Sequence, residues 1–120
     1  WISENRWLVI AQDNPGLLDE ISSSLAGQPV AVTDLSHART VIRLEGPQAR
    51  HLLSKGSSVD MHGDAFPPGE TRATSLGHFN CLIDCNGPES FDIHFMRSFA
   101  DSAWHWLQQA AAPDGFRVTA

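Results

Sequence analysis

The sequence predicts an α+β domain in which helices pack on a mainly antiparallel sheet. The first observation is a strand-like alternation of apolar and polar residues over 39–45, and again on both sides of a turn at Asn86-Gly87-Pro88. The second is the helical spacing of apolar residues over 14–27 and 98–113. A chain of 120 residues fits a single domain, 1–120, with one hydrophobic core.

Composition and charge exclude several classes of protein. With 42% hydrophobic and 18% charged residues, the chain resembles folded globular proteins and not disordered ones. Its net charge of -6 argues against nucleic-acid binding, which needs a basic surface. No apolar run approaches the roughly 20 residues that cross a bilayer, and no signal-peptide pattern opens the chain. We therefore expect a cytoplasmic protein with neither nucleic acid nor membrane as partner.

The first elements are a strand and a helix. The chain begins at Trp1, just ahead of a strand-like segment over 7–11, so we expect an N-terminal portion to be missing. Asn14 and Pro15 then mark the start of a helix, as its N-cap and first residue, and Gly27 ends it. We expect its apolar stripe to rest on the sheet, and the stripe consists of Leu17, Leu18, Ile21 and Leu25.

The next elements are a half-buried strand over 39–45, with Thr40, Ile42 and Leu44 inward, and a short helix between Gly46-Pro47 and Gly56. That helix turns Ala49, Leu52 and Leu53 inward and ends after Lys55. Residues 57–70 show no periodicity, which predicts a long ordered loop with Phe66 as its anchor. A strand is expected over 71–76.

A hairpin follows, with one strongly apolar face made by Phe79, Cys81, Ile83, Cys85, Phe91, Ile93 and Phe95. The two cysteines lie four residues apart in one strand, about 13 Å between their Cα atoms, which is too far for a disulfide. They lack the spacing and the histidine neighbours of a zinc site. We expect buried, reduced thiols, as in a reducing compartment.

The last helix is expected to begin at Ser98, with Asp101 completing a capping box, and to end at Pro113. Its predicted inward stripe consists of Ala100, Ala103, Trp104, Leu107 and Ala111. Trp106 falls about 120° away from the centre of that stripe, on the flank that holds Phe99 and Ala110. Trp106 is therefore either covered by loops of the chain or buried against another subunit.

Arg97 follows Phe91, Ile93 and Phe95 at the same two-residue spacing, so in a continuous strand its side chain would point to the same, inward face. We expect it to be largely buried, because of that parity, and to be paired with a carboxylate or backbone carbonyl. We therefore predict that Arg97 forms a structural ion pair at the corner between sheet and helix. Its alternative partners are an anionic ligand and a neighbouring subunit.

The sequence contains no residue to which we assign a catalytic, cofactor-binding or metal-binding role. Ser36 and His37, near Asp34, point to opposite faces of an extended segment and lack the strained turn of a nucleophile. His62 and Asp64 have no third ligand at a suitable spacing. No glycine-rich loop joins a strand to a helix as in nucleotide sites. The residues to which we assign structural or interface roles are Lys55, Phe66, Arg97, Phe99 and Trp106.

Several segments together resemble one protein family. They are 38–47, 52–56, 66–69, 74–77 and 97–100, with Asp60, Trp104 and Leu107. Lys55-Gly56, combined with the Arg97-Ser98-Phe99-Ala100 run and Trp104, is the most specific part. The chain is similar over about 7–112 to the gamma subunit of heterotetrameric sarcosine oxidases, although Ser57 stands where that family usually has cysteine.

The resemblance implies a domain like one half of the aminomethyltransferase (glycine-cleavage T-protein) folate-binding fold. It also implies a non-catalytic subunit in a complex with alpha, beta and delta subunits. FAD, FMN, NAD and tetrahydrofolate would then belong to the alpha and beta subunits, which oxidise sarcosine to glycine and form hydrogen peroxide with formaldehyde or methylenetetrahydrofolate. A zinc ion would belong to the delta subunit, and this chain alone would bind no cofactor.

Two alternatives remain. One is a free-standing, folate-dependent aminomethyltransferase-like or folate-binding protein, although that fold normally holds folate between two such half-domains and a further domain. The other is a binding module that has kept the fold and lost the complex.

Overall fold

A computed structural model describes residues 2–12 and 14–119. Its centre is a four-stranded antiparallel sheet with the strand order β1-β4-β3-β2. The strands are β1 (Arg39–Glu45), β2 (Thr71–Leu76), β3 (Phe79–Gly87) and β4 (Ser90–Met96). The helices are α1 (Leu17–Ser24), α2 (Ala49–Ser54) and α3 (Ala100–Ala111), and the short 3-10 helix η1 (Arg97–Phe99) leads into α3. The predicted α+β architecture is confirmed.

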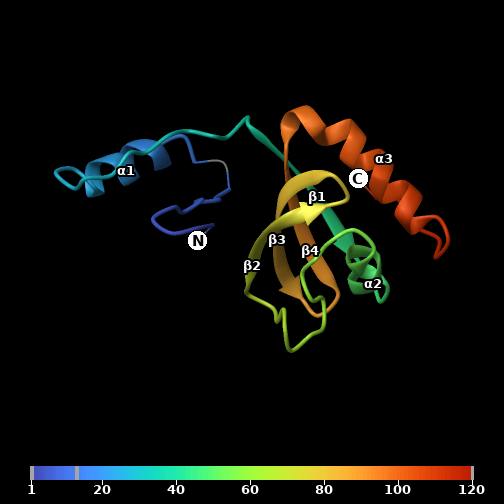
Figure 1. The fold of residues 1–120 in the computed structure, drawn as a ribbon. Helices are drawn as coiled ribbons and strands as arrows, with labels where there is room; N and C mark the ends of the chain where they lie inside the picture. The colour runs from blue at the N-terminus through green and yellow to red at the C-terminus, as the bar shows by residue number, and fades with distance from the viewer. Residues whose placement is uncertain (1, 13, 120) are drawn as a thin grey trace.

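The two faces of the sheet differ because side chains alternate along each strand. The register pairs Ile42 with Ile93 and Ile93 with Ile83, which places all three on one face. This face packs against α2, α3 and the loop over 57–70, and Phe66 is fully buried as the predicted anchor of that loop. Figure 1 shows α2 and α3 along the sheet. The residues predicted to point inward from 39–56 and from the hairpin lie in the core or pack against it, except Thr40, which is half-buried.

The predicted burial of both cysteines is confirmed. Cys81 and Cys85 are both free and buried, and both point to the core face of β3. Burial raises the pKa of the Cys81 thiol to about 11, and the nearby Arg39 offsets only part of this. The thiol is therefore protonated and unreactive at neutral pH.

The N-terminal region differs from the prediction. Residues 7–11 form no strand, and the short pairing before them is an isolated bridge between Ser3 and Arg6. Asn14 accepts a hydrogen bond from the Gly16 amide, but Pro15 lies in the turn that precedes α1 and not in its first position. The helix does not rest on the sheet: Figure 1 shows it well away from the strands, and none of its residues is buried.

The start of the last helix also differs. Strand β4 ends at Met96, and the chain turns through η1 before α3 begins. The N-cap of α3 is Phe99, with no side-chain hydrogen bond to the helix, so the predicted capping box at Ser98 is wrong. Within the described residues, no helix is long and apolar enough to span a membrane.

Candidate functional site: pockets and exposed apolar surfaces

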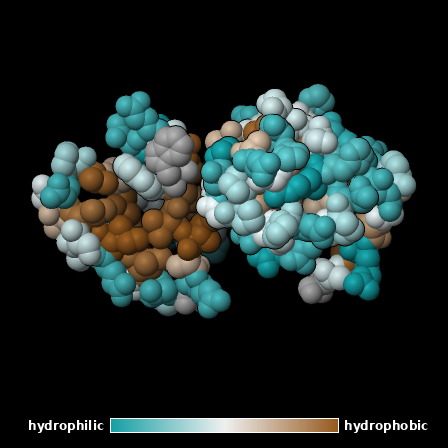
Figure 2. All heavy atoms as spheres, turned by 90° about the horizontal axis from the view of Figure 1, so that it is seen from below, coloured by the Kyte–Doolittle hydropathy of each residue, from teal (hydrophilic) through white to brown (hydrophobic). Residues whose placement is uncertain are grey.

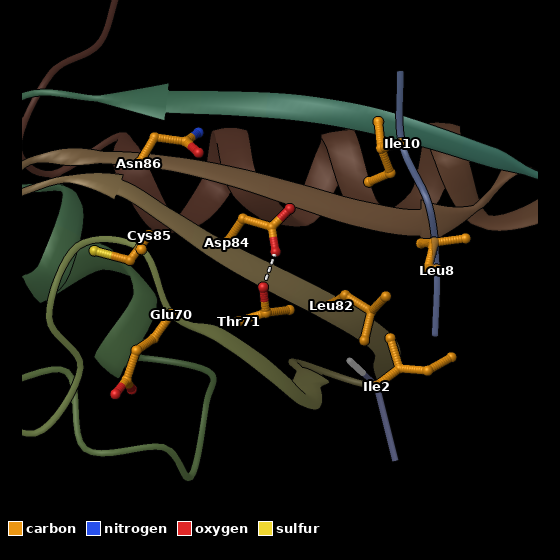
Figure 3. Close-up of a pocket in the computed structure, with 10 residues that line it drawn as sticks. Ile2, Leu8, Ile10, Glu70, Thr71, Leu82, Asp84, Cys85 and Asn86 are labelled. Carbon is orange, nitrogen blue, oxygen red and sulfur yellow. Dashed lines mark hydrogen bonds between the residues drawn. The ribbon is translucent and has the colours of Figure 1, made fainter. Parts of the chain in front are cut away.

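The pockets lie on the face of the sheet opposite α2 and α3. One, of about 320 Å³, is bordered on one side by Ile2, Leu8 and Ile10 of the N-terminal segment. On the other side are residues of β2, β3 and the preceding loop, and Figure 3 shows the N-terminal segment crossing the sheet above them. These residues are Gly69, Glu70, Thr71, Leu82, Asp84, Cys85 and Asn86.

The polar side chains of this pocket already pair with one another. Asp84 accepts a hydrogen bond from the Thr71 hydroxyl at 2.6 Å, drawn in Figure 3, and its other oxygen lies 2.7 Å from Nε2 of His94. The carboxylate stands between hydroxyl and imidazole, whereas in a nucleophilic triad the imidazole stands between hydroxyl and carboxylate. Glu70 is paired with Arg72. This arrangement ties β2, β3 and β4 together and activates no nucleophile.

A second pocket, of about 500 Å³, continues along the same face toward Arg39 and Met96. Its other contributors from the strands include Ala73, Thr74 and Asn80. Cys81 also borders it, but with the raised pKa given above this thiol supplies no thiolate at neutral pH. The second pocket therefore offers polar and apolar surface without an activated group.

The catalytic and metal candidates weighed from the sequence stay separate from these pockets. Asp34 accepts hydrogen bonds from the amide and hydroxyl of Ser36 in a turn, so this segment is not extended as predicted. Those bonds lower the pKa of the Asp34 carboxyl. His62 lies 3.6 Å from Asp64 on an exposed loop. Among residues 2–12 and 14–119, no three histidine, cysteine or acidic side chains are grouped to hold a metal ion.

Arg97 is not buried, which corrects the prediction. Its side chain is exposed and makes no hydrogen bond or ion pair with any other described residue. The parity argument fails because β4 ends one residue earlier, at Met96, and η1 turns Arg97 outward. Arg97 instead belongs to an exposed corner segment, residues 96–99, in which Met96 is 43% and Phe99 46% exposed.

The partly buried arginine that sequence reasoning missed is Arg50. Its guanidinium donates to the carbonyl oxygens of Pro88 at 2.7 Å, Met61 at 2.8 Å and Phe66 at 3.1 Å. It also lies over the ring of Phe91, 5.0 Å from the centroid. One side chain thus fixes the loop over 57–70 against the β3–β4 turn. The signal in the sequence was an arginine beside the buried Ala49, on a helix next to a long aperiodic loop.

The orientation of the two tryptophans of α3 is the reverse of the prediction, which placed Trp104 inward and Trp106 outside the inward stripe. Trp106 packs against the core, and Trp104 is 36% exposed at the edge of the helix. The residues of α3 that are buried are Ala103, Leu107 and Ala111. The helix is therefore rotated toward Trp106 relative to the predicted stripe. Of the two readings proposed for Trp106, coverage by its own chain is the one that the structure shows.

Lys55 holds the end of α3. Its ammonium group donates to the Ala110 carbonyl at 2.9 Å and to the Asp114 carboxylate at 2.7 Å. The bond from Lys55 is the main reason that the pKa of Asp114 is lowered. This cation at a helix C-terminus also complements the helix dipole. Lys55 is thus a structural residue between α2 and α3.

Comparison with known proteins identifies the family. A family model described as "Sarcosine oxidase, gamma subunit family" matches residues 1–113. Two relatives named "Sarcosine oxidase subunit gamma" come from Corynebacterium sp. (strain U-96) and Arthrobacter sp. They are 36% and 34% identical over 110 residues, which are 92% of this chain and 54% of each relative. This chain therefore spans about half the length of these relatives.

A solved structure agrees with these relatives. It is the heterotetrameric sarcosine oxidase from Corynebacterium sp. U-96 in complex with pyrrole 2-carboxylate, one chain of which matches with a TM-score of 0.85 at 34% identity. The match covers 92% of this chain and 56% of that one. Because the family model and these matches span most of its length, the chain belongs to the sarcosine oxidase gamma subunit family.

Proposed function

We propose that the chain acts as a structural, non-catalytic part of a heterotetrameric, flavin-dependent sarcosine oxidase. The observation that carries this proposal is its similarity, over 92% of its length, to one chain of a heterotetrameric sarcosine oxidase. Its role would be to hold neighbouring subunits in place, with alpha, beta and delta subunits as its partners. The two free thiols favour a reducing compartment, and so the cytoplasm, for this assembly.

In the proposed complex, the chemistry takes place on the alpha and beta subunits. These would hold FAD, FMN, NAD and tetrahydrofolate and convert sarcosine to glycine, forming hydrogen peroxide with formaldehyde or methylenetetrahydrofolate. Two features of this chain support its non-catalytic role. Asp84 is occupied by Thr71 and His94, and the amide of Gly46, where a strand meets a helix, already donates a hydrogen bond to the Glu89 carbonyl at 2.9 Å.

The corner segment, residues 96–99, is our candidate for contact with a partner subunit. Met96 and Phe99 expose apolar surface on both sides of Arg97, whose charge is not engaged by the described residues. The Phe99 ring also packs on Phe79 with 5.8 Å between centroids, so it is presented in a fixed position. Aromatic and arginine side chains are enriched among residues that contribute strongly to interfaces.

Co-expression with the proposed partner subunits tests the assembly. We expect the tagged chain to retain the large flavoprotein subunits, and Phe99→Asp to reduce their recovery at least tenfold. The matched control is Val118→Asp in the C-terminal tail, where the side chain is 58% exposed. Equal recovery with both variants would place the contact elsewhere, and no recovery with the unchanged chain would overturn the proposed function.

Cofactor binding separates this proposal from its alternative. We expect the purified chain to be colourless and to retain neither flavin nor NAD. Stoichiometric flavin absorbance in the isolated chain would contradict the structural role. Retention of tetrahydrofolate by the isolated chain, measured by calorimetry, would favour a free-standing folate-binding protein.

A further inference from the structure

The N-terminal arm, which we define as residues 2–12 and 14–35, carries apolar side chains with no core beneath them. None of its residues is buried. Figure 2 shows hydrophobic side chains gathered over the end of the molecule that holds α1, whereas the other end is mainly hydrophilic in this view. The exposed large apolar residues of the arm range from 37% to 66% exposure, and they are Trp7, Val9, Ile10, Leu18, Val30, Val32 and Leu35.

Such a surface is not stable facing water. Helix α1 has eight residues, which is too short for a helix that no tertiary contact supports. Soluble monomers also rarely leave large contiguous apolar patches uncovered. The pattern of the helix is amphipathic, with Asp19 and Glu20 in its first turn and Leu17 and Ile21 on its apolar side. The apolar side of the arm is therefore not covered by the other described residues.

The lengths of the relatives indicate what covers the arm. The three curated relatives match over 110 residues, which are 54% of each, so almost half of each relative lies outside the match. A segment of that size can cover the arm as soon as the polypeptide folds. A partner subunit would cover it only after assembly, and until then the arm would be prone to aggregation.

We propose that the apolar side of the arm packs against a further segment of the same polypeptide, outside these 120 residues, and that the two together form a second small core. The same segment would approach the open pockets, since Ile2, Leu8 and Ile10 of the arm form one side of the 320 Å³ pocket. The proposal rests on membership of the family and not on assembly with other subunits.

Hydrogen exchange with and without the additional segment provides the test. The whole reading frame that contains these residues and the 120-residue chain are each expressed without other subunits. In the longer protein we expect amides of 17–25 and 28–35 to exchange at least tenfold more slowly than in the shorter one. The amides of β3 and β4 serve as the internal control for folding, since their protection does not depend on the arm.

Each other outcome overturns the proposal. Arm amides that stay unprotected in the longer protein, and slow only after the flavoprotein subunits are added, would assign the surface to a partner subunit. Protection that rises with the concentration of the 120-residue chain would assign it to a second copy. A reading frame with no further segment would also refute the proposal. None of these results depends on whether the pull-down above succeeds.

A pair of variants in the longer protein gives a second readout, which stands even if the 120-residue chain does not fold alone. Ile21→Asp should lower the melting temperature of the longer protein by several degrees, because it places a charge in the proposed second core. The matched control is Ser22→Asp, at an exposed position of the same helix. Equal melting temperatures for the two variants would show that this side of α1 is not packed.

Discussion

The indole of Trp106 lies directly on the backbone of Gly56, so closely that a Cβ atom at Gly56 would overlap the six-membered ring. The other half of the indole faces Gly77, and the Gly56 carbonyl accepts a hydrogen bond from the Gly77 amide at 2.9 Å. Two glycines, one after α2 and one in the β2–β3 turn, thus form the surface against which a single side chain of α3 packs. The contact explains why α3 turns Trp106 and not Trp104 inward.

The first prediction concerns the Gly56 contact. Gly56→Ala should lower the free energy of unfolding by about 1–3 kcal/mol, because a methyl group in a packed contact forces the indole or the backbone to move. Gly63→Ala is the matched control, since a Cβ there meets nothing within 4 Å. Its free energy of unfolding should change by less than about 1 kcal/mol. Urea denaturation of both variants measures the difference.

A double-mutant cycle assigns the loss to the indole. In a Trp106→Leu background, the cost of Gly56→Ala should fall in part, because the ring atoms that the new methyl group would overlap are gone while the Gly77 amide nitrogen, 2.8 Å from it, remains. Additive losses in the cycle would mean that the two residues do not touch in solution.

The second prediction concerns the two tryptophans of α3. Trp106→Ala should lower the free energy of unfolding by about 3 kcal/mol, because it removes a large side chain packed against the core. Trp104→Ala should cost less than about 1 kcal/mol, since Trp104 is 36% exposed. Thermal melts of the two variants decide the matter. A larger loss for Trp104 would restore the helix orientation that the sequence pattern first predicted.

The sheet was predictable from the sequence because its two faces have different surroundings. Ile83 and Ile93 lie on the face covered by helices, whereas Val41 and Arg43 lie on the other face and are exposed. That difference produces the alternation along each strand. The short helix α2 was predictable for a similar reason, because Leu52 and Leu53 had to face one core.

The orientation of α3, the direction of Arg97 and the packing of α1 could not be predicted, because they depend on tertiary contacts that local sequence patterns do not contain. The stripe of α3 consists mainly of alanines, so its direction is set by where an indole fits against Gly56. The parity that pointed Arg97 inward ended with the strand at Met96. In α1 the apolar stripe was visible, but a sequence pattern does not state which surface the stripe meets. The interface roles of Arg97 and Phe99 remain predictions.

The third prediction concerns Arg50 and Arg97. Arg50→Met should lower the free energy of unfolding by at least about 2 kcal/mol, because it leaves the carbonyls of Met61 and Phe66 without their charged donor. Arg97→Met should change it by less than about 0.5 kcal/mol in the isolated chain, since its side chain is exposed. Guanidinium denaturation provides the measurement. If Arg50→Lys had the same free energy of unfolding as the unchanged chain, the hydrogen bonds of the guanidinium would not be what stabilises this region, because an ammonium group cannot reproduce its planar, multidirectional donor.

The fourth prediction concerns acid stability and the pair between Arg43 of β1 and Asp92 of β4. The guanidinium donates two hydrogen bonds of 2.7 Å to the carboxylate, and these lower the pKa of Asp92. A carboxyl group with a lower pKa in the folded state binds protons less readily there than when unfolded. Its contribution to stability is therefore present above about pH 4, the unfolded pKa, and is lost as the pH falls through the folded value.

Arg43→Met should accordingly reduce the free energy of unfolding at pH 7, and this reduction should shrink as the pH falls through the lowered pKa of Asp92. The reduction should be small, because the Arg43 side chain is 60% exposed and solvent screens the pair. Carboxyl NMR titration should show the pKa of Asp92 rising in the variant. The pKa of Asp34 should stay low, since its own Ser36 bonds are untouched. An unchanged pKa for Asp92 would mean that the Arg43 guanidinium does not hold this carboxylate in solution, and the loss at pH 7 should then vanish as well.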